Sequence, residues 1–331
     1  MGAGGKQSLE FLKNVVLPVY GNEFLDRLDD SAEILLGGER IAYTTDSYTI
    51  KPIFFPGGDI GKLSVCGTCN DLSVKGAKPL FISAGVIIEE GFPINSLKKI
   101  VSSMSKTAKE IGVRIVTGDT KVVNKGEADG IFINTSGLGI ISPGMNVSCL
   151  NAQKGDDVII TGSIGDHGIS IMNAREKLGL VPEIQSDVEH VYKIVKELTG
   201  YSENIHVMRD PTRGGLASVL NEIATSSKVN ITIFEDKIPI KQEVKKSCDI
   251  LGLDPLYVAN EGKIVMFVSP AATKSLLNKI KILPGGKDAN VIGKVESSTY
   301  TEDTPPVSIK TLLGIKRFVP LIDGEPLPRI C

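Results

Sequence analysis

The chain of 331 residues contains 41% hydrophobic and 23% charged side chains, and its formal net charge is -2. One hydrophobic core rarely serves so many residues, so two domains are expected. The near balance of acidic and basic residues gives no electrostatic case for binding nucleic acid or an anionic membrane, which leaves small molecules and proteins as the expected partners.

Short runs of apolar and β-branched residues recur along the chain and predict buried strands. In chain order these runs are 41–45, 80–88, 113–117, 130–141, 158–161, 231–234, 264–268 and 291–295. Two amphipathic stretches between them predict helices: 95–111, which Gly112 follows, and 187–198, which Thr199 and Gly200 follow. Strands and helices mix in both halves, and 35 glycines without a tryptophan are typical of an α/β protein with tight turns and aliphatic packing.

Breaks in composition divide the chain into three parts. The polar segment 151–156 precedes a new predicted strand, so we place a domain boundary near residue 150 and assign 1–150 to an N-terminal domain. The segment 296–306 is rich in Ser, Thr, Glu and Pro, as linkers are, so a second domain spans 151–306. The remainder, 307–331, is expected to be a mobile tail that ends in Cys331.

The last residue gives this tail a nucleophile. The thiolate of a terminal cysteine can accept or carry a chemical group, although the plain interpretation is a solvated residue without a role. The 17 residues from Gly314 to Cys331 span at most about 56 Å when fully extended. A tail of that length could reach its own active site or that of a partner.

The cysteine count, the first residues and the length of the apolar runs indicate the cellular compartment. Five cysteines are an odd number, which favours reduced thiols over a disulfide framework. The first residues, 1–5, lack the basic and apolar regions of a signal peptide, and no apolar run approaches the length of a membrane span. We therefore expect a cytoplasmic protein that binds no membrane.

The familiar phosphate-binding loops are absent from the sequence. The segment 57–63 resembles a Walker A loop, but it is one residue short and has Leu63 where a metal-binding hydroxyl is required. We interpret it as a glycine turn. No strand-linked GxGxxG motif occurs, so a Rossmann dinucleotide site is not supported.

Acidic residues recur instead at strand ends and in glycine-flanked turns. They are Asp46, Asp71, Asp119, Asp166 and Asp210. Each alone is more often a turn or cap residue. Together they suggest a metal and phosphate site, because Mg²⁺ takes oxygen ligands and is commonly held by a few carboxylates plus substrate phosphates. Lys121, two residues after Asp119, adds a cation that could meet a phosphate or a developing charge.

Five motifs carry a resemblance to a known family. They are Gly118-Asp119-Thr120-Lys121-Val122-Val123, Gly165-Asp166-His167-Gly168, Arg209-Asp210-Pro211-Thr212-Arg213-Gly214-Gly215, Asn260-Glu261-Gly262-Lys263 and Pro328-Arg329-Ile330-Cys331. Over nearly its whole length the chain resembles the HypE family of hydrogenase maturation proteins. The first four motifs are shared more loosely with the aminoimidazole ribonucleotide synthetase-like ATP-binding superfamily, which includes thiamine-monophosphate kinase and selenophosphate synthetase. The terminal motif distinguishes the HypE family from the other members of this superfamily.

The resemblance implies both a fold and a reaction. The implied fold is a two-domain α/β (α+β) arrangement. The mixed sheet of the N-terminal domain pairs across a homodimer, and ATP binds in the cleft between this domain and a C-terminal α/β domain. HypE-like proteins receive a carbamoyl group on the terminal cysteine from the carbamoyltransferase HypF and dehydrate it to a thiocyanate. This supplies the cyanide ligand of the nickel–iron hydrogenase iron centre, delivered to a HypC-HypD complex. The implied cofactors are ATP and Mg²⁺.

The same resemblance assigns residues to roles. The expected nucleotide and metal holders are Asp46, Asn70, Asp71 and Asp119, with Asp210 as a weaker fifth. Among them Asp46, Asp71 and Asp119 are the expected metal ligands.

The catalytic residues implied by the resemblance are three. Cys331 is the mobile thiol, Glu261 is the expected base, and Lys121 polarises the carbamoyl oxygen or assists proton transfer. Without the resemblance, Glu261 would be interpreted as a turn residue in Asn-Glu-Gly-Lys. Which of Glu261 and Lys121 moves the proton stays open.

Other reactive residue types have simpler interpretations. Arg209 and Arg213 flank Asp210 and are either ion-pair partners or bidentate phosphate contacts. His167 is interpreted as a cap or packing residue. The pair Cys66 and Cys69 forms a CxxC motif, but no second pair completes a zinc site, since Cys149 and Cys248 stand alone; we interpret the pair as structural.

Two alternatives to the dehydratase remain. The first is a small-molecule kinase or phosphoryl-activating synthetase of the same superfamily, which would not need Cys331. Selenophosphate synthetases carry a reactive cysteine or selenocysteine in an N-terminal arm, and 1–6 contains none. The second is a nucleotide-sensing scaffold that presents its tail without chemistry of its own.

Overall fold

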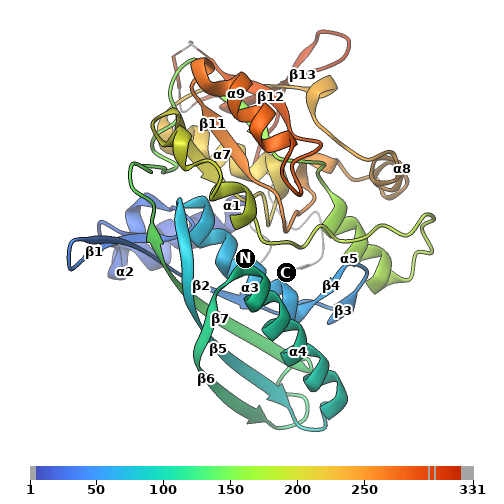
Figure 1. Cartoon of the computed structure of the whole chain (residues 1–331). Coiled ribbons are helices and arrows are strands. Elements are labelled where there is room, and N and C mark those ends of the chain that lie inside the picture. Colours follow the sequence, from blue (N-terminus) through green and yellow to red (C-terminus); the bar gives the residue numbers. More distant parts are fainter. Residues whose placement is uncertain (1–4, 297–298, 302, 322–331) are drawn as a thin grey trace.

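The structure is a computed structural model, and it describes residues 5–296, 299–301 and 303–321 (Figure 1). Two sheets form the centres of two halves, with the N-terminal sheet below and the C-terminal sheet above in Figure 1. All eight predicted strands are present as strands of these sheets. No helix among the described residues has the length and apolar character needed to cross a membrane.

The N-terminal half is built on a five-stranded mixed sheet with strand order β1-β2-β7-β5-β6. Its strands are β1 (Ala32–Leu36), β2 (Glu39–Tyr48), β5 (Ala77–Glu89), β6 (Arg114–Val123) and β7 (Ile131–Ile141). β6 pairs with β5 in parallel, whereas the other neighbours are antiparallel. β6 therefore ends the sheet with one edge unpaired among the described residues.

Two helices cover one face of this sheet (Figure 1). α4 (Ile94–Ile111) has the predicted amphipathic pattern, and it ends at Gly112, which adopts φ 83°. α3 (Ile60–Val74) begins at Asp59, whose Oδ1 accepts hydrogen bonds from Gly61 N at 2.7 Å and Lys62 N at 3.1 Å. The loop that resembles a phosphate-binding motif is therefore a turn followed by a capped helix.

α3 is buried on nearly all sides because it lies between the sheet and the C-terminal half. Gly67 faces β2 so closely that a Cβ atom there would collide with Tyr48 Oη. Cys66 and Cys69 are both fully buried on this helix, and burial raises the pKa of the Cys69 thiol to about 12. Such thiols are inert, which supports the structural interpretation of the pair.

The C-terminal half contains a seven-stranded sheet with order β14-β13-β10-β12-β8-β11-β9. Its strands are β8 (Asp157–Ile160), β9 (Ile205–Arg209), β10 (Ile231–Phe234), β11 (Val265–Val268), β12 (Asn290–Val295), β13 (Val307–Lys310) and β14 (Lys316–Phe318). Its helices are α5 (Asp166–Glu176), α6 (Tyr192–Val195), α7 (Gly215–Ser227), α8 (Gln242–Leu251) and α9 (Pro270–Lys281). The apolar side chains that these helices and strands bury are mostly aliphatic.

The smaller elements lie mostly at the start of the chain and in connections. They are α1 (Gly5–Phe11), η1 (Leu12–Val16), α2 (Leu17–Tyr20), η2 (Leu25–Arg27), β3 (Phe54–Phe55), β4 (Gly58–Asp59), η3 (Thr199–Asn204), η4 (Glu235–Lys237) and η5 (Pro255–Tyr257).

Two expectations about the C-terminal half are wrong. The tail does not begin at residue 307, because β13 pairs in parallel with β10 and β14 pairs with β13. The expected helix 187–198 is helical only over α6, because Asp187 and Val191 are held by other groups. Asp187 Oδ1 accepts from Glu261 N at 3.1 Å, and Val191 N donates to Asn70 Oδ1 at 2.8 Å.

Candidate functional site

Three carboxylates from separate parts of the chain meet between the two halves. Asp30 precedes β1, Asp71 lies on α3, and Asp210 follows β9. One oxygen from each lies within 4.8 Å of the other two. We call these three residues the acidic cluster.

Burial shapes the acidity of the cluster. Burial, reinforced by the charges of Asp46 and Asp210, holds the pKa of Asp71 well above its ordinary value. The pKa of Asp210 is raised to about 6 by burial, with Asp46 adding to the shift. Burial also raises the pKa of Asp30, although Arg209 opposes it. Crowded carboxylates of this kind are favourable as anions only beside a cation.

The cluster fits a divalent cation. Oxygen ligands of an octahedral Mg²⁺, each about 2.1 Å from the ion, lie about 3 to 4 Å from one another, which the spacing of the cluster permits. Asp30 Oδ2 is buried and accepts no hydrogen bond from any described residue. An orphaned buried carboxylate oxygen next to two further carboxylates is the environment that a cation would satisfy.

Arg209 fixes one member of the cluster. Its Nε lies 2.7 Å from Asp30 Oδ1, and its Nη2 lies 3.2 Å from Glu222 Oε2 on α7. Its Nη1 donates to Cys149 Sγ at 2.9 Å and to Leu28 O at 3.4 Å. The guanidinium therefore ties the segment before β1 to the C-terminal half, and Arg209 is an ion-pair partner within the protein.

Asp46 borders the cluster from β2. Tyr48 Oη donates to Asp46 Oδ2 at 3.1 Å, and Arg213 Nη2 lies 4.0 Å from Asp46 Oδ1. Thr44, on the same face of β2, donates to Asp71 Oδ2 at 2.9 Å. The structure thus brings three of the predicted holders together, namely Asp46, Asp71 and Asp210.

Glu261 lies buried beside this group. Burial, with the charges of Asp210, Asp187 and Asp46, raises the pKa of Glu261 well above its ordinary value, and Arg213 opposes the shift. Its side chain therefore favours the protonated form while no cation is near. A carboxyl group with a raised pKa, next to an acidic cluster, is a candidate for proton transfer.

Asn70 has a supporting position. Its Nδ2 donates to Glu189 O at 3.1 Å and Glu261 O at 3.4 Å, and its Oδ1 accepts from Val191 N. These bonds join α3 to the chain around Glu261. The structure places Asn70 as a connection between the halves that positions Glu261, with its amide directed at main-chain groups.

Asp119 and Lys121 lie apart from the cluster within one chain. Paired residues on neighbouring strands point to the same face of a sheet. Asp46 pairs with Thr135, Thr135 with Ala84, and Ala84 with Gly118, so Gly118 shares the face of Asp46. Asp119 therefore points to the opposite, open face, and so does Lys121. Within one chain, Asp119 and Lys121 therefore lie on the face opposite the other predicted holders, and their predicted roles stay predictions.

Asp30 is the residue that sequence reasoning missed. The acidic residues were sought after predicted strands and in glycine-flanked turns, whereas Asp30 stands before β1, a strand that was not predicted. The available signal was the acidic pair Asp29-Asp30 directly ahead of the apolar residues Ile34 to Leu36. Cys331, the predicted thiol, lies outside the described residues.

His167 has the packing role that was predicted. It is fully buried in the first turn of α5, where Nδ1 lies 2.8 Å from Ser186 Oγ and the ring meets Phe55 edge to face. The neighbouring Asp166 is also buried, and it is paired with Lys241 at 3.1 Å. Within the described residues these contacts give His167 a packing role and pair Asp166 with a lysine.

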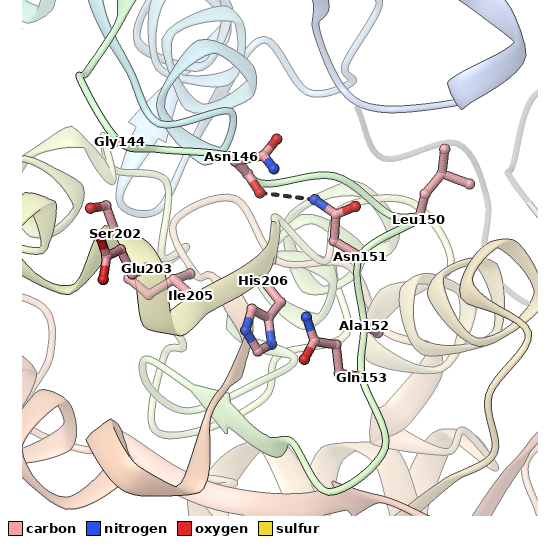
Figure 2. A pocket seen from close by; sticks show the side chains of 10 residues that line it. All are labelled: Gly144, Asn146, Leu150, Asn151, Ala152, Gln153, Ser202, Glu203, Ile205 and His206. Atoms are coloured by element: carbon pink, nitrogen blue, oxygen red, sulfur yellow. Dashed lines mark hydrogen bonds between the residues drawn. The ribbon is translucent and has the colours of Figure 1, made fainter.

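A separate polar cavity of about 540 Å³ lies between the segment 144–153, η3 and the start of β9 (Figure 2). His206 lies in its wall, and its Nδ1 is 2.8 Å from the buried Asp156 carboxylate. None of the ten lining residues is Lys or Arg. The cavity therefore offers no strong positive charge to nucleotide phosphates, and the acidic cluster remains the candidate site.

Comparisons with known proteins agree with the two-domain fold. Residues 28–141 match the family described as AIR synthase related protein, N-terminal domain, and residues 153–303 match its C-terminal domain. A protein of Azotobacter vinelandii named Carbamoyl dehydratase HypE is 43% identical over 100% of this chain and 96% of its own length.

Solved structures agree as well. A chain from a HypE-HypF complex is 50% identical, with a TM-score of 0.89, over 94% of this chain and 99% of that chain. The structure of HypE in complex with ATP is 42% identical, with a TM-score of 0.84, over 100% of this chain and 98% of that chain. The two-domain fold class predicted from the sequence is confirmed. The chain therefore belongs to the HypE family of carbamoyl dehydratases, within the AIR synthase related proteins.

Proposed function

We propose that the protein is an ATP-dependent carbamoyl dehydratase that converts an S-carbamoyl group on Cys331 into a thiocyanate for the iron centre of a nickel–iron hydrogenase. The observation that carries this proposal is 43% sequence identity, over 100% of this chain, with a protein named Carbamoyl dehydratase HypE. The site adds a place where phosphate chemistry can occur, since three carboxylates converge between the halves.

The reaction requires activation of a poor leaving group. Transfer of the ATP γ-phosphoryl group to the carbamoyl oxygen forms a C–O–P linkage and releases ADP. Loss of the nitrogen-bound protons then forms the C≡N bond as the C–O bond breaks and phosphate leaves. The sum is thiocarboxamide plus ATP giving thiocyanate, ADP, phosphate and one proton, so the elements of water leave as part of the phosphate.

The acidic cluster is the proposed site for Mg²⁺. When bound, Mg²⁺ would neutralise phosphate charge during phosphoryl transfer. Asp30, Asp71 and Asp210 would supply ligand oxygens, with Thr44 orienting Asp71 and Arg209 orienting Asp30. Asp46 is close enough to influence the pKa values of Asp71 and Asp210, and we assign it to the nucleotide side of the site.

Glu261 is the proposed proton acceptor. Positive charge at the neighbouring cluster would lower its raised pKa and favour the carboxylate, which is the form that accepts a proton. In this arrangement the proton-accepting carboxylate form of Glu261 becomes favoured only when the site is loaded. Asn70 holds the main chain of Glu261 in place.

A homodimer would give Asp119 and Lys121 a role. The face of the N-terminal sheet opposite α3 and α4 carries exposed apolar side chains, including Tyr43 at 46% and Ile87 at 42% exposure. The described residues of a single chain leave this face uncovered, and such faces favour association. We propose that a second copy packs there, which would bring Asp119 and Lys121 against residues of the partner.

The proposed reaction implies further proteins. The carbamoyl group would come from a carbamoyltransferase of the HypF type, and a HypC-HypD complex would receive the cyanide. Supporting the first of these, a relative 50% identical to this chain has been solved as a HypE-HypF complex. The cytoplasm is the proposed compartment, which agrees with four buried cysteines that form no disulfide.

Replacement of the terminal thiol tests this proposal against a kinase. ADP formation is measured with wild type and Cys331→Ala, in the presence of HypF, carbamoyl phosphate, ATP and Mg²⁺. The HypF-independent background is subtracted. The dehydratase predicts that the additional ADP requires Cys331, whereas a Cys331→Ala protein that still turns over ATP at the wild-type rate would favour a small-molecule kinase.

A further inference from the structure

The hairpin between β13 and β14 presents aliphatic side chains to solvent. Leu312 is 72% exposed, Leu313 87% and Ile315 62%, and Phe318 on β14 is 55% exposed. We call Leu312, Leu313 and Ile315 the hairpin knob. Contiguous exposed apolar side chains of this kind mark interaction sites more often than isolated ones do.

The hairpin is ordered by hydrogen bonds. Thr311 N donates to Ile315 O at 2.8 Å, and Gly314 N donates to Thr311 O at 2.8 Å. Leu312 N donates to Glu235 Oε2 at 2.9 Å, which ties the turn to η4. A surface that is already ordered loses little conformational entropy when a partner covers it.

Two of the three basic residues beside the knob, Lys316 and Arg317, have acidic partners, and the third, Lys310 on β13, is exposed. Lys316 Nζ lies 3.8 Å from Glu296, and Arg317 Nη2 lies 3.3 Å from Asp254. The rim therefore carries Lys310 as a basic side chain beside two ion-paired ones. A partner surface that matches the knob would be an apolar depression, and it would not need strong charge.

The knob lies close in sequence and space to the root of the terminal segment. Val319 N donates to Val307 O at 2.9 Å, and Tyr257 Oη donates to Pro320 O at 2.8 Å, so the chain is fixed up to Pro320. Eight residues separate Leu313 from Leu321, which is a span of at most about 26 Å, and ten separate Leu321 from Cys331, at most about 33 Å.

We propose that the hairpin knob is the docking surface for the protein that loads the carbamoyl group onto Cys331. This inference rests on the proposed function, because it assumes that Cys331 is modified by a separate protein. That protein must bring its reactive site within reach of a thiol tethered at Leu321. A contact at the knob would hold both proteins together while the terminal segment enters the partner's active site, and it would raise the local concentration of the thiol there.

The test is a pair of exposed substitutions with a matched control. Leu312→Ser/Leu313→Ser removes two of the three knob side chains without disturbing buried packing, since both are mostly exposed. Ile282→Ser removes an aliphatic side chain that is 78% exposed and follows α9, away from the hairpin at the β8 and η3 side of the sheet. Each protein is assayed for HypF affinity by calorimetry and for the rate of carbamoyl addition by intact-mass spectrometry.

The expected result is HypF binding at least about tenfold weaker for the double variant and unchanged for Ile282→Ser. Loading of the double variant should be slow at low HypF and recover at saturating HypF, and thermal unfolding should match wild type. Wild-type HypF affinity in the double variant would overturn the inference. So would weakened binding accompanied by a changed molar mass, since the knob would then join two copies of this chain.

A third variant separates the knob from the terminal segment itself. A chain that stops at Leu321 should retain most of the HypF affinity, and loss of all binding in that variant with normal binding in the double variant would place the contact in the terminal segment. If wild type binds HypF through the knob but is never carbamoylated, the proposed function fails while the docking surface stands.

Discussion

Removal of the Arg209 guanidinium is expected to destabilise the junction between the two halves. In Arg209→Gln, the Asp30 carboxylate loses a cation at 2.7 Å, and Glu222 loses one at 3.2 Å. Deleting one partner of a buried ion pair typically costs about 3 to 5 kcal/mol. Glu222 is one-third exposed and is screened by water, so we expect the lower end, about 3 kcal/mol.

A change of this size is measurable by thermal unfolding. For a unit of about 150 residues or more, about 3 kcal/mol corresponds to a midpoint lowered by about 6 to 12 °C. The loss should be smaller at pH 5.5 than at pH 7.5, because Asp30 already has a raised pKa and can take up a proton when Arg209 is absent. Arg209→Lys should recover only part of the stability, since an ammonium cannot reach Asp30, Glu222 and Cys149 at once.

Glu222→Gln is the matched control, because it leaves the pair of Arg209 with Asp30 intact. It should cost less than about 1 kcal/mol. If Arg209→Gln unfolds at the wild-type midpoint at both pH values, or Glu222→Gln costs as much, the view that Arg209 positions Asp30 across the junction is refuted.

Three further predictions concern the site and the open sheet face. First, because the pKa values of the acidic cluster and Glu261 are raised, their contribution to folding stability is present at low pH and is lost as pH rises, through about 6 for Asp210. Mg²⁺ binds the carboxylate forms, so the increase that it causes in the thermal unfolding midpoint should grow from pH 5 to pH 8. An increase that does not depend on pH would contradict the proposed site. Second, Glu261→Gln should leave carbamoyl loading intact but slow the loss of water by about 10²- to 10⁴-fold in single-turnover mass spectrometry; wild-type dehydration would exclude Glu261 as the base. Third, Ile87→Asp should convert the proposed dimer to a monomer in light scattering, whereas an unchanged molar mass would show that the open face is not the interface.

Strand patterns made most of the sheets predictable. Most predicted runs are apolar and β-branched because the strands they form are buried, as the fully buried β11 (Val265–Val268) shows. The run 113–117 is the exception, because it forms β6 (Arg114–Val123), which is exposed at all residues except Val123. The helix α4 was equally predictable from its amphipathic pattern, because one of its faces packs on the protein and the other is exposed to water. α3 is buried on nearly all sides, so its sequence has no polar face to reveal a helical period.

The site was harder to predict because pairing and register decide it. Asp46, Asp71 and Asp210 were found from their motifs, and the structure gathers them. Asp119 looked equivalent, yet a position next to Gly118 on β6 directs it to the opposite face of the sheet. A shift of one residue along a strand moves a side chain to the opposite face of the sheet, and the local sequence does not indicate which face packs against α3.

The C-terminal strands illustrate the same limit. β13 is only four residues long, and it pairs with β10 in parallel, more than seventy residues earlier in the chain. A short strand after a polar, proline-containing segment is indistinguishable from a linker until that long-range pairing is known.

Intact-mass spectrometry of the protein tests the central claim most directly. The protein is incubated with HypF and carbamoyl phosphate, the loaded form is isolated, and Mg-ATP is added or withheld, with Cys331→Ala in parallel. The account predicts one carbamoyl group added at Cys331, followed by loss of one water that depends on ATP. A carbamoyl adduct that keeps its full mass with Mg-ATP, while HypF is demonstrably active, would contradict dehydration and favour a nucleotide-sensing scaffold.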